Sequence, residues 1–383
     1  MKFASERGIV TTFTPAEYEN RVRRLKERMR TLGVEVALFD EIEAMAWLSG
    51  YGNSQNRWRC IVIPLEGEPF FLIRTLDAQA CSERTWISDV ISFADWEDPV
   101  LTLAALLKNR GLDGAKIGLD WNSYSTSIAR FEQIKEALPH AHLINIGALI
   151  WELRLIKSPA EIALLSGAAQ ICDEALLRAA RLAKPGATQR DLLLAATIAF
   201  IEGGAEPAHP GVVTFAQGDN FLHRHMSEAK LRDSDVIHFE VVPKFGGYSA
   251  REMRSIPVGP PSPDLVHIAD DIAAIQDEQF SAMRPGALAC DVDAIVRSGL
   301  IAAGLRDSYE NITGYTLGFY VTQGPRTSDF TRIFHPKSEW KLEEGQVFHM
   351  YAAARGVSLS ETVVIEATGS RRLTSLPRQL LSS

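Results

Sequence analysis

Hydrophobic and polar positions follow two different periods over the first 150 or so residues. A helical period runs through TPAEYENRVRRLKERMRTLG, where Thr14 is a capping residue, Glu17 its capping-box partner and Gly33 the stop. Short β-branched or aromatic runs follow, namely VEVALFD, RCIVIPL, EPFFLIR, SDVISFA and AKIGLDW, and helical patterns lie in PVLTLAALLKNRG and STSIARFEQIKEAL. This alternation predicts an α/β domain of roughly 150 residues.

A second domain is predicted from the next helical pattern, IWELRLIKSPAEIALLSGAAQICDEALLRAARLAKPG. Its main helix should begin at Ser158-Pro159, because proline suits the first helical turn. We therefore place the boundary near Leu153 and expect domains at residues 1–152 and 153–383.

The second domain contains an internal repeat. Residues 182–206 and 282–306 align without a gap at an offset of 100, and each copy is followed by strand patterns. VIHFE after the first copy corresponds to VFHMY after the second, which aligns His238 with His349. Such self-similarity indicates a duplicated α/β unit whose halves enclose a cleft, a favoured place for a ligand.

Composition narrows the classes of function. The 383 residues are 46% hydrophobic and carry a formal net charge of −8 without a basic tract, which argues against nucleic acid as a partner. No apolar run approaches the ~20 residues of a membrane helix, and no signal-peptide pattern opens the chain, so we expect a cytoplasmic protein without membrane contact. The four cysteines lack ligand spacing and are expected to be reduced.

Several stretches carry a resemblance to a known family. WELRLIKSPAEIALLSGAAQICDEAL, MAWLSGY and HRHMSEAKLRDSDVIHFEVVPKFGGYSAREMRS together resemble the creatinase, aminopeptidase P and prolidase family over nearly the whole chain. The resemblance implies an α/β N-terminal domain plus an α+β C-terminal pita-bread domain with internal pseudo-twofold duplication. It also implies a homodimer.

Metallopeptidases of this family bind two divalent ions through two aspartates, one histidine and two glutamates. On that pattern the five ligand positions fall on Glu240, Arg251, Tyr315, Tyr351 and Ser360. A guanidinium repels cations and has no lone pair to donate. The resemblance therefore implies a divergent member without the dinuclear centre, and we expect no metal and no cofactor.

Creatinase keeps this fold and hydrolyses a carbon–nitrogen bond without metal, with a histidine as acid and base. His223 is the matching histidine, twelve residues before Asp235 as in the family pattern, and His225 is its competitor. Imidazole titrates near neutrality and suits both proton transfers. We predict His223, Glu240 and Arg251 as catalytic residues.

The predicted substrate-binding set combines the remaining charged and hydroxyl positions of the cleft with one arginine of the first domain. Its members are Glu252, Arg254, Tyr315, His349, Tyr351, Ser360, Glu361 and Arg57. Arg57 stands where family members send an arginine toward the cleft of a dimer partner, and Thr322 stands where a second active-site histidine is usual. Structural interpretations remain open: an Arg251–Glu240 ion pair, tyrosines that fill vacated space, and a solvated loop arginine.

The leading hypothesis is a metal-independent hydrolase of a non-peptide carbon–nitrogen bond in a small amino-acid-like or amidino compound. Creatine itself fits poorly, because Met253 precedes Arg254 and Tyr351 replaces a glutamate that grips guanidinium in creatinase. Two alternatives remain: a catalytically inactive pita-bread protein that binds ligands or acts as a scaffold, and a lyase that uses the same pocket.

Overall fold

The computed structural model describes residues 3–4, 10–52, 56–207, 209–319 and 331–382. The described residues up to Leu153 form one compact unit (unit 1), and those from Arg154 onward form another (unit 2). Within these ranges, no helix combines the length and apolar character that a bilayer-spanning segment requires.

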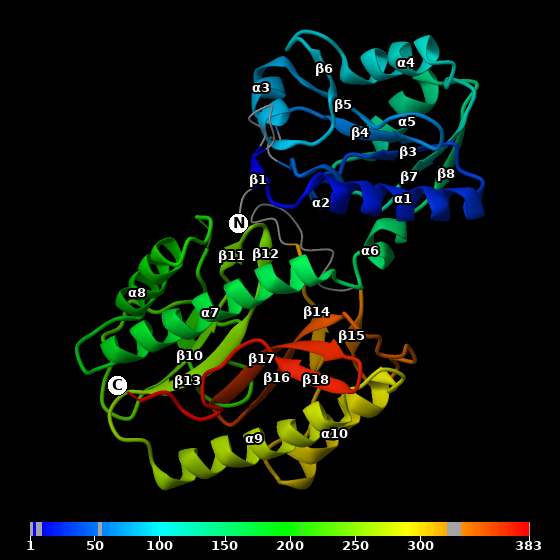
Figure 1. Ribbon diagram of the computed structural model, residues 1–383. Coiled ribbons are helices and arrows are strands. Elements are labelled where there is room, and N and C mark those ends of the chain that lie inside the picture. Colours follow the sequence, from blue (N-terminus) through cyan, green and yellow to red (C-terminus); the bar gives the residue numbers. More distant parts are fainter. Residues whose placement is uncertain (1–2, 5–9, 53–55, 208, 320–330, 383) are drawn as a thin grey trace. The chain divides into compact units, whose positions relative to one another are not determined.

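Unit 1 is an α/β structure, as its alternating pattern predicts (Figure 1). Its elements are β1 (Phe3–Ala4), β2 (Val10–Thr11), α1 (Pro15–Leu32), β3 (Val36–Phe39), α2 (Ile42–Ser49), β4 (Cys60–Pro64), β5 (Phe70–Arg74), α3 (Thr75–Arg84), β6 (Asp89–Phe93), α4 (Pro99–Asn109), β7 (Lys116–Leu119), α5 (Ile128–Ala137), β8 (His142–Asn145) and α6 (Leu149–Leu153). The main sheet has the order β6-β5-β4-β3-β7-β8, and β4 runs antiparallel to both neighbours. Val36, Leu38, Leu103 and Ile134 belong to one core cluster between this sheet and helices α4 and α5.

Helix α1 begins and ends where the sequence predicts. Thr14 Oγ1 accepts the N–H of Glu17 at 3.4 Å, and Gly33 ends the helix with a left-handed φ of 64°. The carboxylate of Glu17 accepts from Arg21 Nε at 3.2 Å. Among the described contacts, only the Thr14 half of the predicted capping box is formed.

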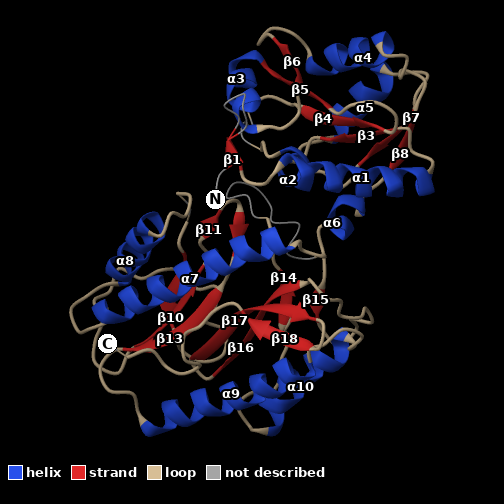
Figure 2. Ribbon diagram, viewed as in Figure 1, coloured by secondary structure: helices blue, strands red, loops and turns tan. Residues whose placement is uncertain are grey.

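Unit 2 consists of two helical pairs and the strands between them (Figure 2). Its elements are α7 (Pro159–Leu182), α8 (Gln189–Glu202), β9 (Gly211–Phe215), β10 (Val236–Val241), β11 (Lys244–Phe245), β12 (Tyr248–Ser249), β13 (Glu252–Pro257), α9 (Pro263–Ala282), α10 (Ala289–Ala302), β14 (Gly314–Thr316), β15 (Ile333–Phe334), β16 (Val347–Ala354), β17 (Val357–Glu366) and β18 (Gly369–Arg372). The strands form sheets of order β13-β10-β9 and β15-β14-β16-β17-β18, with β11 and β12 as a separate hairpin. Helices α7 and α8 lie on one side of the strands, and α9 and α10 lie on the other.

The duplication read from the sequence is present in the backbone contacts of unit 2. Gly186 N donates to Leu231 O at 2.9 Å in the first half, and Gly286 N donates to Leu342 O at 2.8 Å in the second. Equivalent residues therefore close equivalent loops after α7 and α9. The two-domain fold class with internal duplication is confirmed.

Strands β13 and β17 lie side by side and are joined through hydroxyl side chains. Ser360 Oγ accepts the N–H of Met253 at 2.7 Å. Thr362 Oγ1 accepts the N–H of Arg251 and donates to its carbonyl, both at 2.9 Å. We call these contacts the seam. The seam joins the two halves of unit 2, and it holds the backbone of Arg251, one of the predicted catalytic residues.

Candidate active site

A cavity of about 340 Å³ lies in unit 2 between the two halves. Its described lining is Val212, Leu222, His223, Arg224, Glu240, Arg251, Met253, Ile312, Tyr315 and Tyr351. Five residues of the predicted site are thus brought to one cavity: the three predicted catalytic residues and two of the tyrosines. Three of them come from the first half of unit 2 and two from the second, so the pairing of the halves is what brings them together.

Arg251 directly precedes β13 and is nearly fully buried, with 2% of its surface exposed. Its Nη1 donates to Tyr315 Oη and lies 4.0 Å from Glu240 Oε1. The guanidinium carbon is 5.1 Å from the centre of the Tyr315 ring. Thr362 in the seam holds the Arg251 backbone from behind. A fixed positive charge therefore lies in the cavity wall beside one carboxylate.

His349 connects the cavity wall to the seam. Its Nδ1 lies 2.9 Å from Tyr315 Oη, and its Nε2 lies 2.7 Å from Ser360 Oγ. Burial, reinforced by the charge of Arg251, lowers the pKa of His349 well below its ordinary value. The imidazole is therefore neutral, with one donor and one acceptor nitrogen. His349 and Ser360 thus position Tyr315 from behind and do not themselves line the cavity.

Tyr351 completes this wall. Its ring stacks on His349 with centroids 5.5 Å apart and meets Tyr315 edge-on at 6.1 Å. Burial raises the pKa of Tyr351, so the phenol keeps its proton and can donate a hydrogen bond. The packing interpretation of the tyrosines and the binding interpretation are both consistent with this geometry.

His223 and Arg224 bring exposed polar groups to the cavity from the loop before β10. His225 is exposed but is not among the lining residues, which favours His223 as the acid and base. Arg224 was not predicted from the sequence, although its position directly after His223 gave a hint. The cavity wall therefore carries two arginines and one carboxylate.

Three predicted substrate-binding residues lie away from the cavity, on the other face of the seam. Glu252, Arg254 and Glu361 are fully buried and do not line the cavity. Arg254 Nη2 donates to Glu361 Oε1 at 2.9 Å and lies 2.8 Å from Glu252 Oε1 without hydrogen-bond alignment. Successive side chains on a strand point to opposite faces, so Arg251 and Met253 face the cavity while Glu252 and Arg254 face away. Their placement gives no support to contact with a substrate.

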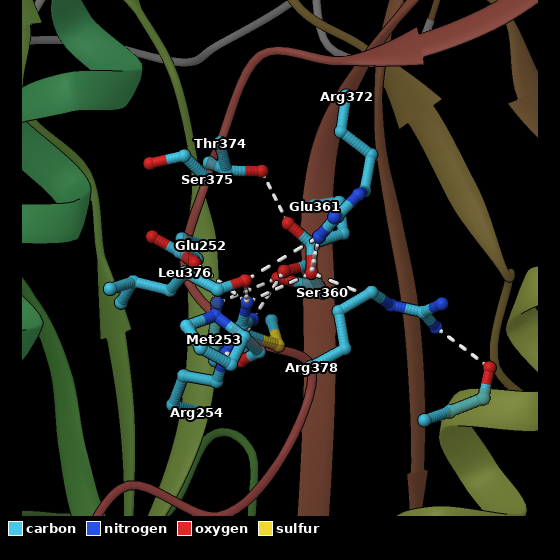
Figure 3. Close-up of polar contacts among 12 residues, drawn as sticks. Glu252, Met253, Arg254, Ser360, Glu361, Arg372, Thr374, Ser375, Leu376 and Arg378 are labelled. Atoms are coloured by element: carbon cyan, nitrogen blue, oxygen red, sulfur yellow. Dashed lines mark hydrogen bonds and ion pairs between the residues drawn. The ribbon is translucent and has the colours of Figure 1, made fainter.

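Arg254 and Glu361 bind the C-terminal segment instead, and Glu252 lies beside Arg254. Arg254 donates to the carbonyls of Pro377 at 3.2 Å and Leu376 at 3.3 Å, and Thr374 Oγ1 donates to Glu361 (Figure 3). Burial raises the pKa of Glu252, and the neighbouring Arg254 guanidinium opposes this effect. The charges of this cluster therefore hold the end of the chain.

Two further predicted positions lie elsewhere. Arg57 belongs to unit 1, where its Nη2 donates to the carbonyl of Glu97 at 3.0 Å. Its contact with a dimer partner stays a prediction. Thr322 lies outside the described residues.

The residues that line the cavity do not fit the two-metal centre of the family's metallopeptidases. Four of the five ligand positions line it, and they are occupied by Glu240, Arg251, Tyr315 and Tyr351. Glu240 supplies the one carboxylate, and the Arg251 guanidinium lies 4.0 Å from it. Within the described ranges, no group of three or more His, Cys, Asp or Glu side chains has the geometry to hold a metal ion. This donor set suits an anion better than a pair of cations.

Comparison with known proteins agrees with this architecture. Residues 163–367, more than half of the chain, match the model of metallopeptidase family M24, and residues 21–156 match the creatinase/prolidase N-terminal domain. An ectoine hydrolase of Halomonas elongata is 24% identical over 96% of this chain and 98% of its own length. A putative dipeptidase of Bacillus subtilis is 24% identical over 94% and 99%.

Solved structures share the fold. A prolidase from Thermococcus sibiricus superposes with a TM-score of 0.83 at 24% identity, covering 96% of this chain and 99% of its own. An Xaa-Pro dipeptidase from Bacillus anthracis gives the same score at 19% identity, covering 96% and 100%. The relatives support a hydrolase, and the chain belongs to metallopeptidase family M24, with a creatinase/prolidase N-terminal domain before it.

Proposed function

We propose that this protein is a metal-independent hydrolase of a non-peptide carbon–nitrogen bond in a small amide or amidino compound that carries a carboxylate. The observation that carries the proposal is the buried guanidinium of Arg251 in a family metal-ligand position, within a cavity that the exposed His223 also lines. A charged arginine cannot replace a metal as Lewis acid, but it can bind an anionic substrate group.

The charges of the cavity support the carboxylate. Arg224 and Arg251 together outweigh Glu240, so the described wall has a net positive charge of one unit from these residues. Glu240 keeps the Arg251 side chain directed along the wall, since Nη1 lies 4.0 Å from its carboxylate. A substrate carboxylate near the two arginines would be oriented as well as attracted.

The proposed chemistry uses His223 twice. As neutral imidazole, it accepts a proton from a water molecule whose oxygen attacks the carbon of the carbon–nitrogen group. The electron pair of the double bond moves to the heteroatom, which accepts a hydrogen bond from Tyr351. The imidazolium then returns the proton to the leaving nitrogen, the carbon–nitrogen bond breaks with its electron pair on nitrogen, and the double bond re-forms. One water is consumed.

The similarity to an ectoine hydrolase supports this class of substrate. Ectoine is a cyclic amidine that bears a carboxylate, so it has both of the groups that the cavity calls for. At 24% identity the similarity gives a class of compound to test, and ectoine is one member of that class.

One observation favours a second candidate, a ligand-binding protein without catalysis. Within the described part of the chain, no hydrogen bond or ion pair orients the His223 imidazole, whereas acid–base histidines are commonly held by a second group. The same cavity would then bind a carboxylate compound and leave it intact.

Activity and chelation distinguish these candidates. Purified protein would be incubated with ectoine, N-carbamoylglycine and guanidinoacetate, with and without EDTA, and the products would be measured by chromatography. We expect turnover of at least one compound that persists in EDTA and falls about 100-fold or more in His223→Ala. His225→Ala, two residues away and outside the cavity, is the matched control and should keep its activity.

Loss of activity in EDTA with recovery on added Mn²⁺ would overturn metal independence. Binding without turnover, unchanged in His223→Ala, would favour the ligand-binding candidate.

A further inference from the structure

A second hollow of about 250 Å³ adjoins the cavity. Its described lining is Asp219, Asn220, Leu222, His223, Asn311 and Tyr351. Leu222, His223 and Tyr351 also line the larger cavity, so these three side chains form a wall common to both hollows. We call the smaller hollow the recess. A molecule that fills both would pass His223 at its middle.

Asp219 is the charged group of the recess, and its two oxygens differ. Oδ1 accepts the N–H of Arg355 at 2.7 Å. Oδ2 lies 3.9 Å from Arg306 Nε, which is an ion-pair distance but too long for a hydrogen bond. The side chain is 39% exposed and lines the recess. One carboxylate oxygen therefore fixes the side chain and the other remains able to accept an N–H.

Asn220 and Asn311 also line the recess. The backbone of Asn311 is held, because its carbonyl accepts from Arg297 Nη2 at 2.8 Å. Neither asparagine side chain forms a hydrogen bond with any described residue. The recess is thus lined by one carboxylate and two neutral amide groups that can accept hydrogen bonds, whereas the larger cavity carries two guanidinium groups and one carboxylate.

We propose that the recess binds a planar N–H-bearing group, ureido or amidino, at the end of the substrate opposite its carboxylate. This inference rests on the proposed hydrolase function and names the substrate class more closely. Arg306 partly offsets the charge of Asp219, so hydrogen bonding to N–H groups is a better match than a compact ammonium. With the carboxylate at Arg251 and the N–H group at Asp219, the carbon–nitrogen bond lies at His223, on the shared wall.

Two probes that differ at one end test this. N-carbamoylglycine carries a terminal NH₂, and N-(methoxycarbonyl)glycine carries OCH₃ in its place, while both keep the carboxylate. Dissociation constants would be measured by calorimetry with the full chain, using His223→Ala as host for any probe that is consumed. We expect N-carbamoylglycine to bind about tenfold more tightly, the effect of one or two hydrogen bonds to a charged acceptor.

Asp219→Asn is the sharpest variant. Its remaining oxygen can still accept the Arg355 N–H, so an NH₂ group replaces the accepting Oδ2 and opposes the N–H of the probe. Asp219→Asn and Asn311→Leu should each bring the preference between the probes close to one. Asp307→Asn, at an exposed position outside both hollows, should keep the tenfold preference. Thermal melting of every variant reports whether its fold is intact.

The outcomes separate this inference from the proposed function. Suppose that the unsubstituted protein binds the two probes equally and Arg251→Met weakens both. This result would contradict the proposed role of the recess and would still support a carboxylate site at Arg251. A preference that survives in Asp219→Asn and Asn311→Leu would also contradict the role of the recess. Affinities unchanged by Arg251→Met would contradict the carboxylate site, and binding of neither probe would contradict both proposals.

Discussion

Two histidines buried in the strands of unit 2, His238 and His349, make the stability of the fold depend on pH. His238 is fully buried, with Nδ1 2.7 Å from Ser358 Oγ, and burial lowers its pKa to about 3. The unfolded chain binds a proton at this residue below pH ~6.5, and the folded chain does not until near pH 3. The free energy of unfolding therefore falls as the pH falls through this window. His349 acts in the same direction.

We predict that His238→Gln removes about 1 kcal/mol per pH unit of this dependence between pH 6 and pH 5. Urea unfolding at a series of pH values measures it. His140→Gln, at an exposed position, is the control and should leave the slope as it is. An unchanged slope in His238→Gln would mean that the folded protein accepts this proton.

Single residues also show how far sequence reasoning reaches. The family pattern groups Glu240, Arg251 and Tyr315, and in the structure all three line one cavity, while their roles stay a prediction. The sequence reasoning placed Arg251 and Arg254 in the same site, although alternation along a strand puts them on opposite faces, and only Arg251 lines the cavity. Asn311 gave no signal, because it reaches the recess from a loop whose path is set by tertiary contacts.

At the scale of elements, the hydrogen bonds of the seam between β13 and β17 hold the part of the cavity wall that contains Arg251. Thr362 supplies both a donor and an acceptor to the buried backbone of Arg251. Thr362→Val keeps the shape but leaves both backbone groups unsatisfied, and we expect a loss of about 2–3 kcal/mol in the free energy of unfolding. Denaturant unfolding measures the loss.

Thr197→Val is the matched control for the seam. Thr197 Oγ1 donates to the carbonyl of Leu193 within helix α8, so that carbonyl keeps its helical N–H when the hydroxyl is removed. Its effect should stay below about 0.5 kcal/mol. A Thr362→Val protein as stable as this control would show that β13 and β17 are held by packing alone.

The positions of the strands were more predictable from the sequence than the contacts between them. The strand patterns predicted β10, β13, β16 and β17, and the repeat predicted that the two halves face each other. Ser360 was expected to contact a substrate, and Thr362 had no predicted role. Their use as backbone partners follows only from the side-by-side placement of β13 and β17, which local pattern does not encode.

At the scale of the whole molecule, the end of the chain ties together elements from both halves of unit 2. Ser375 Oγ donates to Asp173 in α7 at 2.5 Å, and Arg378 pairs with Asp277 in α9. Between them, the segment accepts hydrogen bonds from Arg254 in β13. The sequence alone gave this segment no role, because its partners are distant in the chain and buried.

Removing the residues after Leu373 should therefore destabilise unit 2 more than unit 1. Truncation leaves Arg254 and Asp173 without these buried partners, which costs about 3 kcal/mol or more. Hydrogen exchange read by mass spectrometry should show faster exchange in α7, β13 and α9, while α4 in unit 1 keeps its rate and serves as the internal reference. Ser375→Ala should produce a smaller change in the same direction, and Gln379→Ala, exposed in the same segment, should produce none. Equal acceleration in both units would show that the segment supports the chain as a whole and not the joint between the halves of unit 2.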